Sequence, residues 1–90
     1  MTDIIEGVRV RFARSARRHR VAKGRALAVM ASADPVVTTN EHGEAEFSWI
    51  GADERGLEIE IVGVLVIEET DGRELLLVIH VMPTQYRKGR

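Results

Sequence analysis

Residues 57–82 read LEIEIVGVLVI-EETDGRE-LLLVIHVM, and this stretch decides the fold. The odd positions of 57–67 are apolar apart from Gly63, whereas the even positions change from glutamate to valine. This pattern predicts a strand whose first half faces solvent on one side and whose second half is covered on both sides. Gly63 indicates either a bulge or a close approach of the backbone.

The second half of the stretch predicts the partner strand. Asp71-Gly72 is a strong hairpin signal between two apolar runs. Residues 75–82 are apolar at both parities except at His80, so they predict the most buried strand of the domain, which Pro83 ends. The two runs therefore predict an antiparallel hairpin at the centre of a sheet.

More strands are expected upstream of this hairpin. Residues 44–51 alternate, with Phe47 and Trp49 on one face, and residues 36–39 are a short β-branched run. Residues 8–12 alternate between apolar residues and arginine, which predicts a half-buried first strand. Residues 1–7 are expected to be a loose lead-in.

Two helices are predicted between the first strand and the β-rich part. Residues 13–20 contain no Gly or Pro, and residues 23–33 place Leu27 and Met30 on one face. Asp34-Pro35 ends the second helix, because the residue before proline avoids the α region. The expected fold is a single α+β domain over residues 1–90. Its two layers are an N-terminal strand and two helices packed on a three- to five-stranded, mainly antiparallel sheet, in the order β-α-α-β-β-β-β.

Charge is strongly segregated along a chain whose net charge is −1. Residues 1–25 hold eight arginines and lysines against two acids, and residues 34–74 hold twelve acids against two arginines. This segregation of charge favours binding of a polyanion by the basic residues 1–25. The chain has no cysteine, no signal segment and no apolar run near the ~20 residues of a membrane span, so we expect a cytoplasmic protein with no membrane partner.

The sharpest candidate site is the cluster Arg14, Arg17, Arg18, His19 and Arg20, together with Arg11. Guanidinium groups pair bidentately with phosphates and stabilise charge in a transition state, and histidine moves protons near neutral pH. The competing interpretation is a solvated helix face that balances the acidic strands.

His80 is the second candidate, although a histidine in an apolar strand is more often a satisfied core residue. The strand carrying it is followed by Tyr86, Arg87 and Lys88, which could meet the basic N-terminal segment at one sheet edge. A histidine, a tyrosine and several arginines are sufficient for RNA cleavage without a metal. The catalytic candidates are therefore His80, His19, Arg18 and Arg87, and the candidate phosphate-binding residues are Arg11, Arg14, Arg17, Arg20, Tyr86 and Lys88.

Other chemistries have little support in the sequence. The three histidines lack paired metal-ligand spacing, and no phosphate-binding glycine loop or nucleophile elbow is present, so we expect neither a metal nor a cofactor. Phe47 and Trp49 could stack on bases, but a tryptophan on a half-buried strand more often belongs to the core.

Three segments resemble small bacterial toxins of the BrnT-like and RelE-superfamily type. Residues 10–21 (VRFARSARRHRV) are similar to their opening strand and basic helix, residues 47–51 and 56–67 to their central hairpin, and residues 75–87 to their last strand and basic tail. The resemblance implies an mRNA endoribonuclease, acting free or on the ribosome, beside an antitoxin protein. It also implies that Arg14, Arg18, Arg20 and Arg87 take the family's basic roles, with His80 in a polar position of the last strand.

Three hypotheses stay open from the sequence. The first is the toxin component of a type II toxin–antitoxin system, a metal-independent mRNA endoribonuclease. The second is a non-catalytic module whose basic segment docks an acidic or DNA-binding partner. The third is a homodimer that pairs sheet edges.

Overall fold

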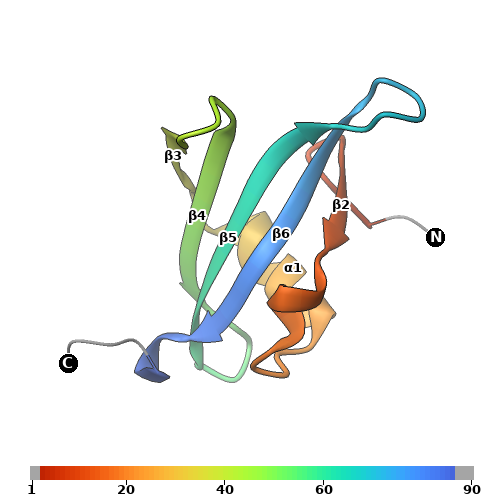
Figure 1. Cartoon of the computed structure of the whole chain (residues 1–90). Coiled ribbons are helices and arrows are strands. Elements are labelled where there is room, and N and C mark those ends of the chain that lie inside the picture. Colours follow the sequence, from red (N-terminus) through yellow and green to blue (C-terminus); the bar gives the residue numbers. More distant parts are fainter. Residues whose placement is uncertain (1–2, 87–90) are drawn as a thin grey trace.

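The computed structural model describes residues 3–86 and contains one six-stranded mixed sheet with one α-helix (Figure 1). The sheet has the order β1-β2-β6-β5-β4-β3. Four neighbouring pairs are antiparallel, and β2 joins β6 in parallel. The elements are β1 (Asp3–Ile5), β2 (Val8–Phe12), the 3₁₀ turn η1 (Arg14–Arg17), α1 (Lys23–Ser32), β3 (Val36–Thr39), β4 (Ala45–Ala52), β5 (Glu58–Ile67), β6 (Glu74–Pro83) and the 3₁₀ turn η2 (Thr84–Tyr86).

The predicted fold class is wrong in its helices and in the size of its sheet. The molecule is mostly sheet, with six strands and a single α-helix in the described residues, rather than two helices on three to five strands. The central hairpin itself forms where the sequence predicts it, as β5 and β6. The parallel pairing of β2 with β6 brings the start of the chain beside its last strand.

The first predicted helix, over residues 13–20, is only the single turn η1. A helix there would stack like charges, because Arg14 and Arg18 would be four residues apart with no acid between them. Eight residues are also too few to form a helix without strong packing. Arg20 ends the segment with a φ of 58°, in the left-handed region.

The expected loose lead-in instead contributes strand β1. Asp3, Ile4 and Ile5 pair with Val10, Arg9 and Val8 of β2 in an antiparallel hairpin. The two turn residues, Glu6 and Gly7, have φ values of 50° and 85°. Positive φ at both central residues is the geometry of the type I′ turn, one of the two favoured turns of two-residue hairpins.

Helix α1 covers one face of the sheet and forms the core there. Its residues Ala26, Val29 and Met30 are buried against Ile59 and Ile61 of β5. The rest of this core comes from the same face of the sheet and from η1, and consists of Val10, Ala16, Trp49, Leu76, Val78 and Val81. Gly51 lets the helix approach β4 closely because it has no side chain. An added Cβ there would lie 3.1 Å from Val29 Cγ1.

A bulge interrupts the pairing of β5 with β6. Val62 faces His80 but Gly63 faces Val78, so Ile79 is an extra residue on β6. Gly63 also makes a close approach, because an added Cβ would lie 3.0 Å from Leu76 Cδ1. Both features that the sequence indicated at Gly63 are therefore present.

The opposite face of the sheet, here called the open face, has no helix or strand from the described residues packed on it (Figure 1). The sequence predicted that the second half of residues 57–67 would be covered on both sides, and Val64 of this half is indeed only 7% exposed. In the structure, α1 lies on one side only.

Candidate functional site

The segment between β2 and α1 is hydrogen-bonded to the last part of β6. The backbone N–H of Ala13 donates to the carbonyl oxygen of Val78 at 2.8 Å, which extends the parallel pairing past Phe12. The hydroxyl of Ser15 then donates to the carbonyl oxygen of Ile79, also at 2.8 Å. Ile79 is the bulged residue, so its backbone leaves the regular ladder. Its carbonyl oxygen can therefore accept a hydrogen bond from a side chain. These two bonds hold η1 beside His80.

His19 and His80 lie side by side as a result. Their ring centres are 6.4 Å apart, and the rings stand edge to face at 77°. The two candidate catalytic histidines, from opposite ends of the sequence, are therefore brought together. His80 lies on the open face because it is opposite Val62 in the ladder.

Glu60 is the third ionisable group of this site. Its Oε1 atom lies 3.9 Å from Nε2 of His80, within ion-pair distance when the imidazole is protonated. The side chains of His80 and Glu60 are 36% and 22% exposed, so the pair is accessible to a ligand without being fully solvated.

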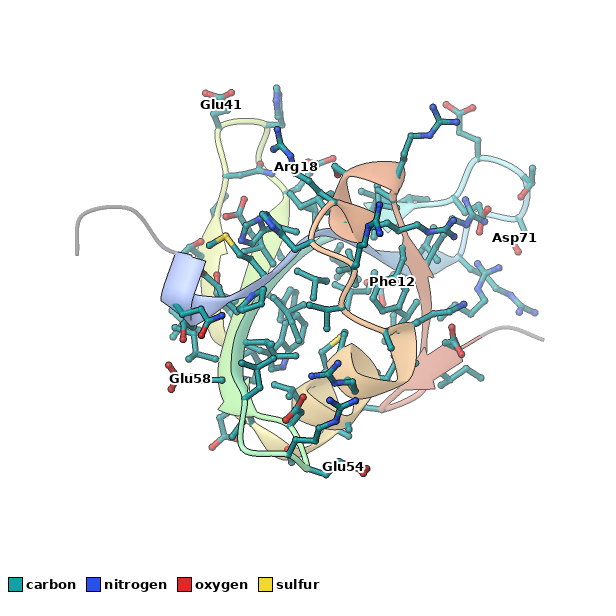
Figure 2. The ribbon with its side chains drawn as sticks, turned by 90° about the horizontal axis from the view of Figure 1, so that it is seen from below. Phe12, Arg18, Glu41, Glu54, Glu58 and Asp71 are labelled. Carbon is teal, nitrogen blue, oxygen red and sulfur yellow. The ribbon has the colours of Figure 1, made fainter. Side chains whose placement is uncertain are left out.

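Four arginines lie close to His19 in the sequence. The side chains of Arg14, Arg17, Arg18 and Arg20 are exposed and form no ion pair within the described residues. Figure 2 places Arg18 next to the η1 turn, whereas the labelled acids lie toward the periphery of the view. This part of the predicted basic cluster is therefore available to an anion.

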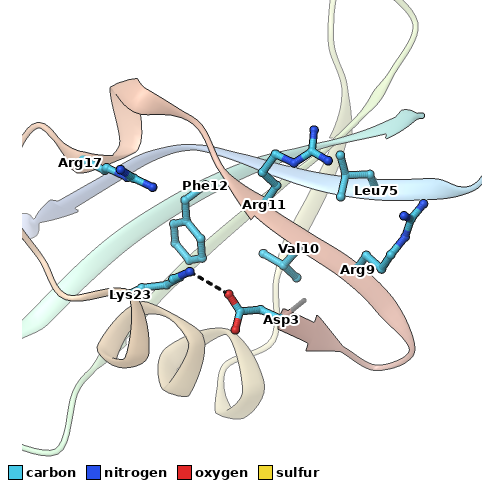
Figure 3. A pocket seen from close by; sticks show the side chains of 8 residues that line it. All are labelled: Asp3, Arg9, Val10, Arg11, Phe12, Arg17, Lys23 and Leu75. Atoms are coloured by element: carbon cyan, nitrogen blue, oxygen red, sulfur yellow. Dashed lines mark ion pairs between the residues drawn. The ribbon is translucent and has the colours of Figure 1, made fainter. Parts of the chain in front are cut away.

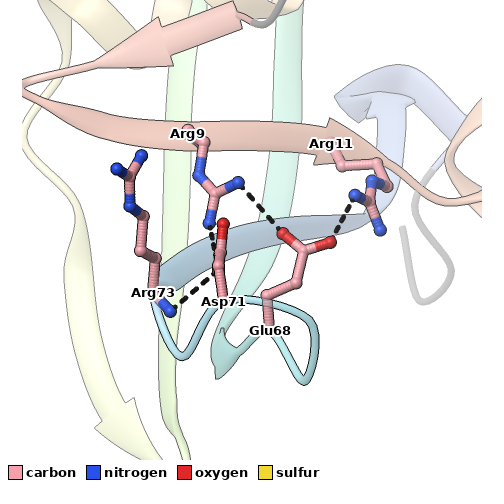
Figure 4. A network of polar contacts seen from close by, with 5 residues as sticks. All are labelled: Arg9, Arg11, Glu68, Asp71 and Arg73. Atoms are coloured by element: carbon pink, nitrogen blue, oxygen red, sulfur yellow. Dashed lines mark hydrogen bonds and ion pairs between the residues drawn. The ribbon is translucent and has the colours of Figure 1, made fainter.

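Arg11, a predicted phosphate-binding residue, is instead held by the β5–β6 turn (Figure 4). Its Nη2 atom donates to Oε2 of Glu68 at 2.8 Å. Arg9 contacts the same carboxylate and also Asp71, in each case at 3.2 Å. Two of the eight N-terminal cations thus stabilise the β2–β6 contact.

The Asp71 carboxylate is itself stabilised in its charged form. The backbone N–H of Arg73 donates to Asp71 Oδ1 at 3.0 Å, and Arg9 lies nearby. These contacts outweigh desolvation and hold the pKa of Asp71 below its ordinary value.

A small basic pocket of about 230 Å³ lies on the outer side of β2 (Figure 3). Arg17 lines it together with Lys23, whose Nζ atom contacts Asp3 at 3.2 Å and lies 5.9 Å from the centre of the Phe12 ring. The other lining residues are Arg9, Val10, Arg11 and Leu75. Arg17 is the cation of this pocket that has no ion pair among the described residues.

The C-terminal candidates are only partly described. Tyr86 ends η2, which is fixed by the hydroxyl of Thr84 donating to Oε1 of Glu58 at 2.8 Å. Arg87 and Lys88 lie outside the described residues.

Metal binding and base stacking find little support in the geometry. Within residues 3–86, no three His, Cys, Asp or Glu side chains are grouped as metal ligands. Phe47 and Trp49 stack on each other with ring centres 5.8 Å apart, and Trp49 is only 4% exposed. Trp49 is therefore a core residue.

Sequence reasoning missed two contributors, Glu60 and Ser15. The alternation of residues 57–67 predicts only that Glu58 and Glu60 face solvent on one side of the strand. The signal that identifies it is strand parity: Glu60 and Val62 share a face, and Val62 is opposite His80. Ser15 could not be found this way, because its role depends on the bulge at Ile79.

Comparison with family models, with curated proteins and with solved structures gives no match for this chain. The resemblance to BrnT-like and RelE-superfamily toxins therefore stays a prediction. None of the described helices is long and apolar enough to cross a membrane.

Proposed function

We propose that this domain is a metal-independent RNA endoribonuclease, the toxin component of a type II toxin–antitoxin system. The observation that carries the proposal is the pairing of His19 with His80 beside arginines that have no acidic partner among the described residues. The resemblance of residues 10–21 and 75–87 to toxins of this type supports the biological setting. The partners are then RNA, free or on the ribosome, and an antitoxin protein.

The chemistry needs one group to remove a proton and one to supply it. A neutral imidazole takes the proton of a ribose 2′-hydroxyl, and the oxygen attacks the adjacent phosphorus. The bond from phosphorus to the 5′-oxygen breaks, and the protonated imidazole gives its proton to that oxygen. The products are a 2′,3′-cyclic phosphate and a 5′-hydroxyl, and no metal takes part.

The spacing of the two rings suits this reaction. Each catalytic hydrogen bond spans about 2.6–3.2 Å, so two rings centred 6.4 Å apart can reach two different oxygens of one phosphate group. The roles of base and acid are open between His19 and His80. Arg14 and Arg18 lie in or beside η1 and would stabilise the charge on the phosphate in the transition state.

Arg17 and Arg20 would bind neighbouring phosphates of the RNA chain. Arg17 and Lys23 line a pocket of about 230 Å³, which is large enough for a phosphate group. Each such contact strengthens binding without choosing a sequence, and makes binding weaken as salt increases.

The test is cleavage of a labelled mRNA by the purified protein in EDTA, both free and on ribosomes, with the product ends identified. We expect 2′,3′-cyclic phosphate ends. His19→Ala and His80→Ala should each lower the cleavage rate by about 100-fold or more, the usual contribution of a general acid or base. His42→Ala is the matched control, because His42 is exposed in the β3–β4 turn, and should cleave at the unchanged rate.

Intact RNA in both assays, or equal rates for the His42 and His80 variants, would refute the proposal. A growth test after induced expression examines toxicity in cells. The wild-type protein should arrest growth, and His80→Ala should not.

The second candidate is a non-catalytic module whose basic segment docks an acidic partner. Arg17 and Arg18, which are exposed and have no ion pair within residues 3–86, favour it equally. Replacing both with glutamate should then abolish complex formation, while no RNA is cleaved by the wild-type protein.

A further inference from the structure

The open face of the sheet has an apolar centre that no element in the described residues covers. Val64 and Val66 of β5 and Leu77 and Ile79 of β6 form the floor of a hollow of about 580 Å³. The bulge enlarges this floor, because Ile79 joins Leu77 on the open face instead of pointing toward α1.

Such a face is unusual for a sheet with only one helical layer. Antiparallel sheets with one solvated side normally alternate apolar residues toward the core with polar residues toward water. In β5, Ile59 and Ile61 point toward α1, while Val62, Val64 and Val66 continue an apolar row on the other side. Val64 is only 7% exposed, whereas Val62 and Val66 are half-buried, so part of this row is accessible to a partner.

The rim of the hollow is acidic on the side of β4. Glu41, Glu44 and Glu46 line it, together with Asn40 and His42. Glu44 accepts a hydrogen bond from Asn40, and the Glu41 side chain is 87% exposed. Glu46 has no ion pair among the described residues, so the rim carries negative charge that a partner could neutralise.

The cations nearest the other side of the open face do not offset this rim. Arg9 and Arg11 are opposite Leu75 and Leu77 in the ladder, but both are already bound to Glu68. Arg9 and Arg11 are therefore not available to neutralise the acidic rim of a second copy, whereas a partner helix can supply its own lysines or arginines.

We propose that the open face docks an amphipathic helix of a partner protein, with its apolar side in the hollow and lysines or arginines against Glu41, Glu44 and Glu46. A helix is the element that completes a layer on a sheet, as α1 does on the other face. The partner chemistry is cationic and apolar, the opposite of the acidic partner that would bind Arg17 and Arg18. The proposal does not rest on RNA cleavage.

The test measures binding of a fluorescein-labelled model helix of leucine and lysine by fluorescence anisotropy. A peptide with glutamate in place of each lysine has the same apolar side. The lysine peptide should bind saturably, and the glutamate peptide at least about tenfold more weakly, which corresponds to about 1.4 kcal/mol.

Matched variants locate the binding site. Val66→Lys in the floor and Glu46→Lys at the rim should each weaken binding of the lysine peptide by about tenfold. Ile67→Lys is the control for the floor, because Ile67 is 62% exposed and the next residue in β5 points to the opposite face. Glu54→Lys is the control for charge, because Glu54 is an exposed acid in the β4–β5 turn. Both controls should bind like the wild-type protein, and thermal unfolding confirms that each variant is folded.

Three results would overturn the proposal. These are equal binding of both peptides, equal loss in the controls, and a wild-type dimer in sedimentation that Val66→Lys dissociates, which would assign the face to a second copy. A His19→Ala/His80→Ala protein should still bind the peptide. Wild-type protein that binds the lysine peptide but cleaves no RNA would refute the proposed function alone.

Discussion

Asp53 shows how single side chains hold the loops that join the strands of this domain. It is a buried acid, at 7% exposure, in the β4–β5 turn. Its Oδ2 atom accepts hydrogen bonds from Arg25 of α1 at 2.7 Å and 2.6 Å, and Oδ1 accepts from the backbone N–H groups of Arg55 and Leu57 at 2.9 Å. Desolvation alone would raise the pKa of Asp53, but these bonds together lower it below its ordinary value.

A pH dependence follows from this lowered pKa. A carboxyl group whose pKa is lower in the folded state stabilises the fold above the unfolded pKa of about 3.9, and this contribution disappears as pH falls through the folded pKa. Asp53→Asn should therefore lower the thermal unfolding temperature at pH 7, and its difference from the wild-type protein should shrink below about pH 4. Circular dichroism melts across pH 3–7 (roughly the range that spans this titration) measure the effect.

Glu54→Gln is the control for this pH series, because Glu54 is exposed and adjacent in the same turn. It should melt like the wild-type protein. A constant difference between Asp53→Asn and wild type over the whole pH range would show that the charge of Asp53 does not stabilise the fold.

At the scale of elements, the bulge between β5 and β6 links packing to the candidate site. Gly63 allows the close approach of Leu76 on the helix side, while the extra residue Ile79 offers its carbonyl to Ser15. The hydrogen bond from Ser15 holds η1, and η1 is followed directly by Arg18 and His19. One irregularity in a strand pair therefore sets the position of a histidine on another element.

Gly63→Ala tests the close approach of Leu76 to Gly63. The added methyl group would lie 3.0 Å from Leu76 Cδ1, so the leucine must shift, at a cost of about 1–3 kcal/mol typical of overpacking. Chemical denaturation measures this loss.

Gly24→Ala is the glycine control, because an added Cβ there has nothing within 4 Å. Gly24 lies in α1, so alanine should stabilise the protein by about 0.5–1 kcal/mol. If Gly63→Ala leaves the stability unchanged, the close contact with Leu76 is not tight.

At the scale of the whole molecule, the largest core lies on one face of the sheet. Ile59, Ile61 and Val29 are at most 1% exposed and lie between the sheet and α1. On the open face, Val64 and Leu75 are buried but lie outside this core, and Val66 and Leu77 are only half-buried. The molecule therefore has one complete core and one incomplete apolar surface.

Truncations on the two faces should differ accordingly. Ile61→Ala should cost about 2–5 kcal/mol of unfolding free energy, because it leaves a cavity in a packed core. Val66→Ala on the open face should cost clearly less, since water already contacts that side chain. Urea unfolding measures the free energy of unfolding of both variants. Equal losses of this free energy would contradict the assignment of the main core to the α1 face.

The sequence by itself determined the central hairpin, the glycine at its bulge and the basic segment around His19. These are local properties, because strand alternation, turn chemistry and runs of charge are all written in neighbouring residues. It did not determine β1, the 3₁₀ turn in place of a helix, or the parallel pairing of β2 with β6.

Those features depend on contacts between distant residues, and so does the candidate site. Arg11 looked free in the sequence, but Glu68 neutralises it across the sheet. His19 and His80 became neighbours because β2 joined β6 and Ser15 bonded to the bulged Ile79. Only the tertiary structure could decide this, because the free energy of such contacts depends on which strands lie side by side.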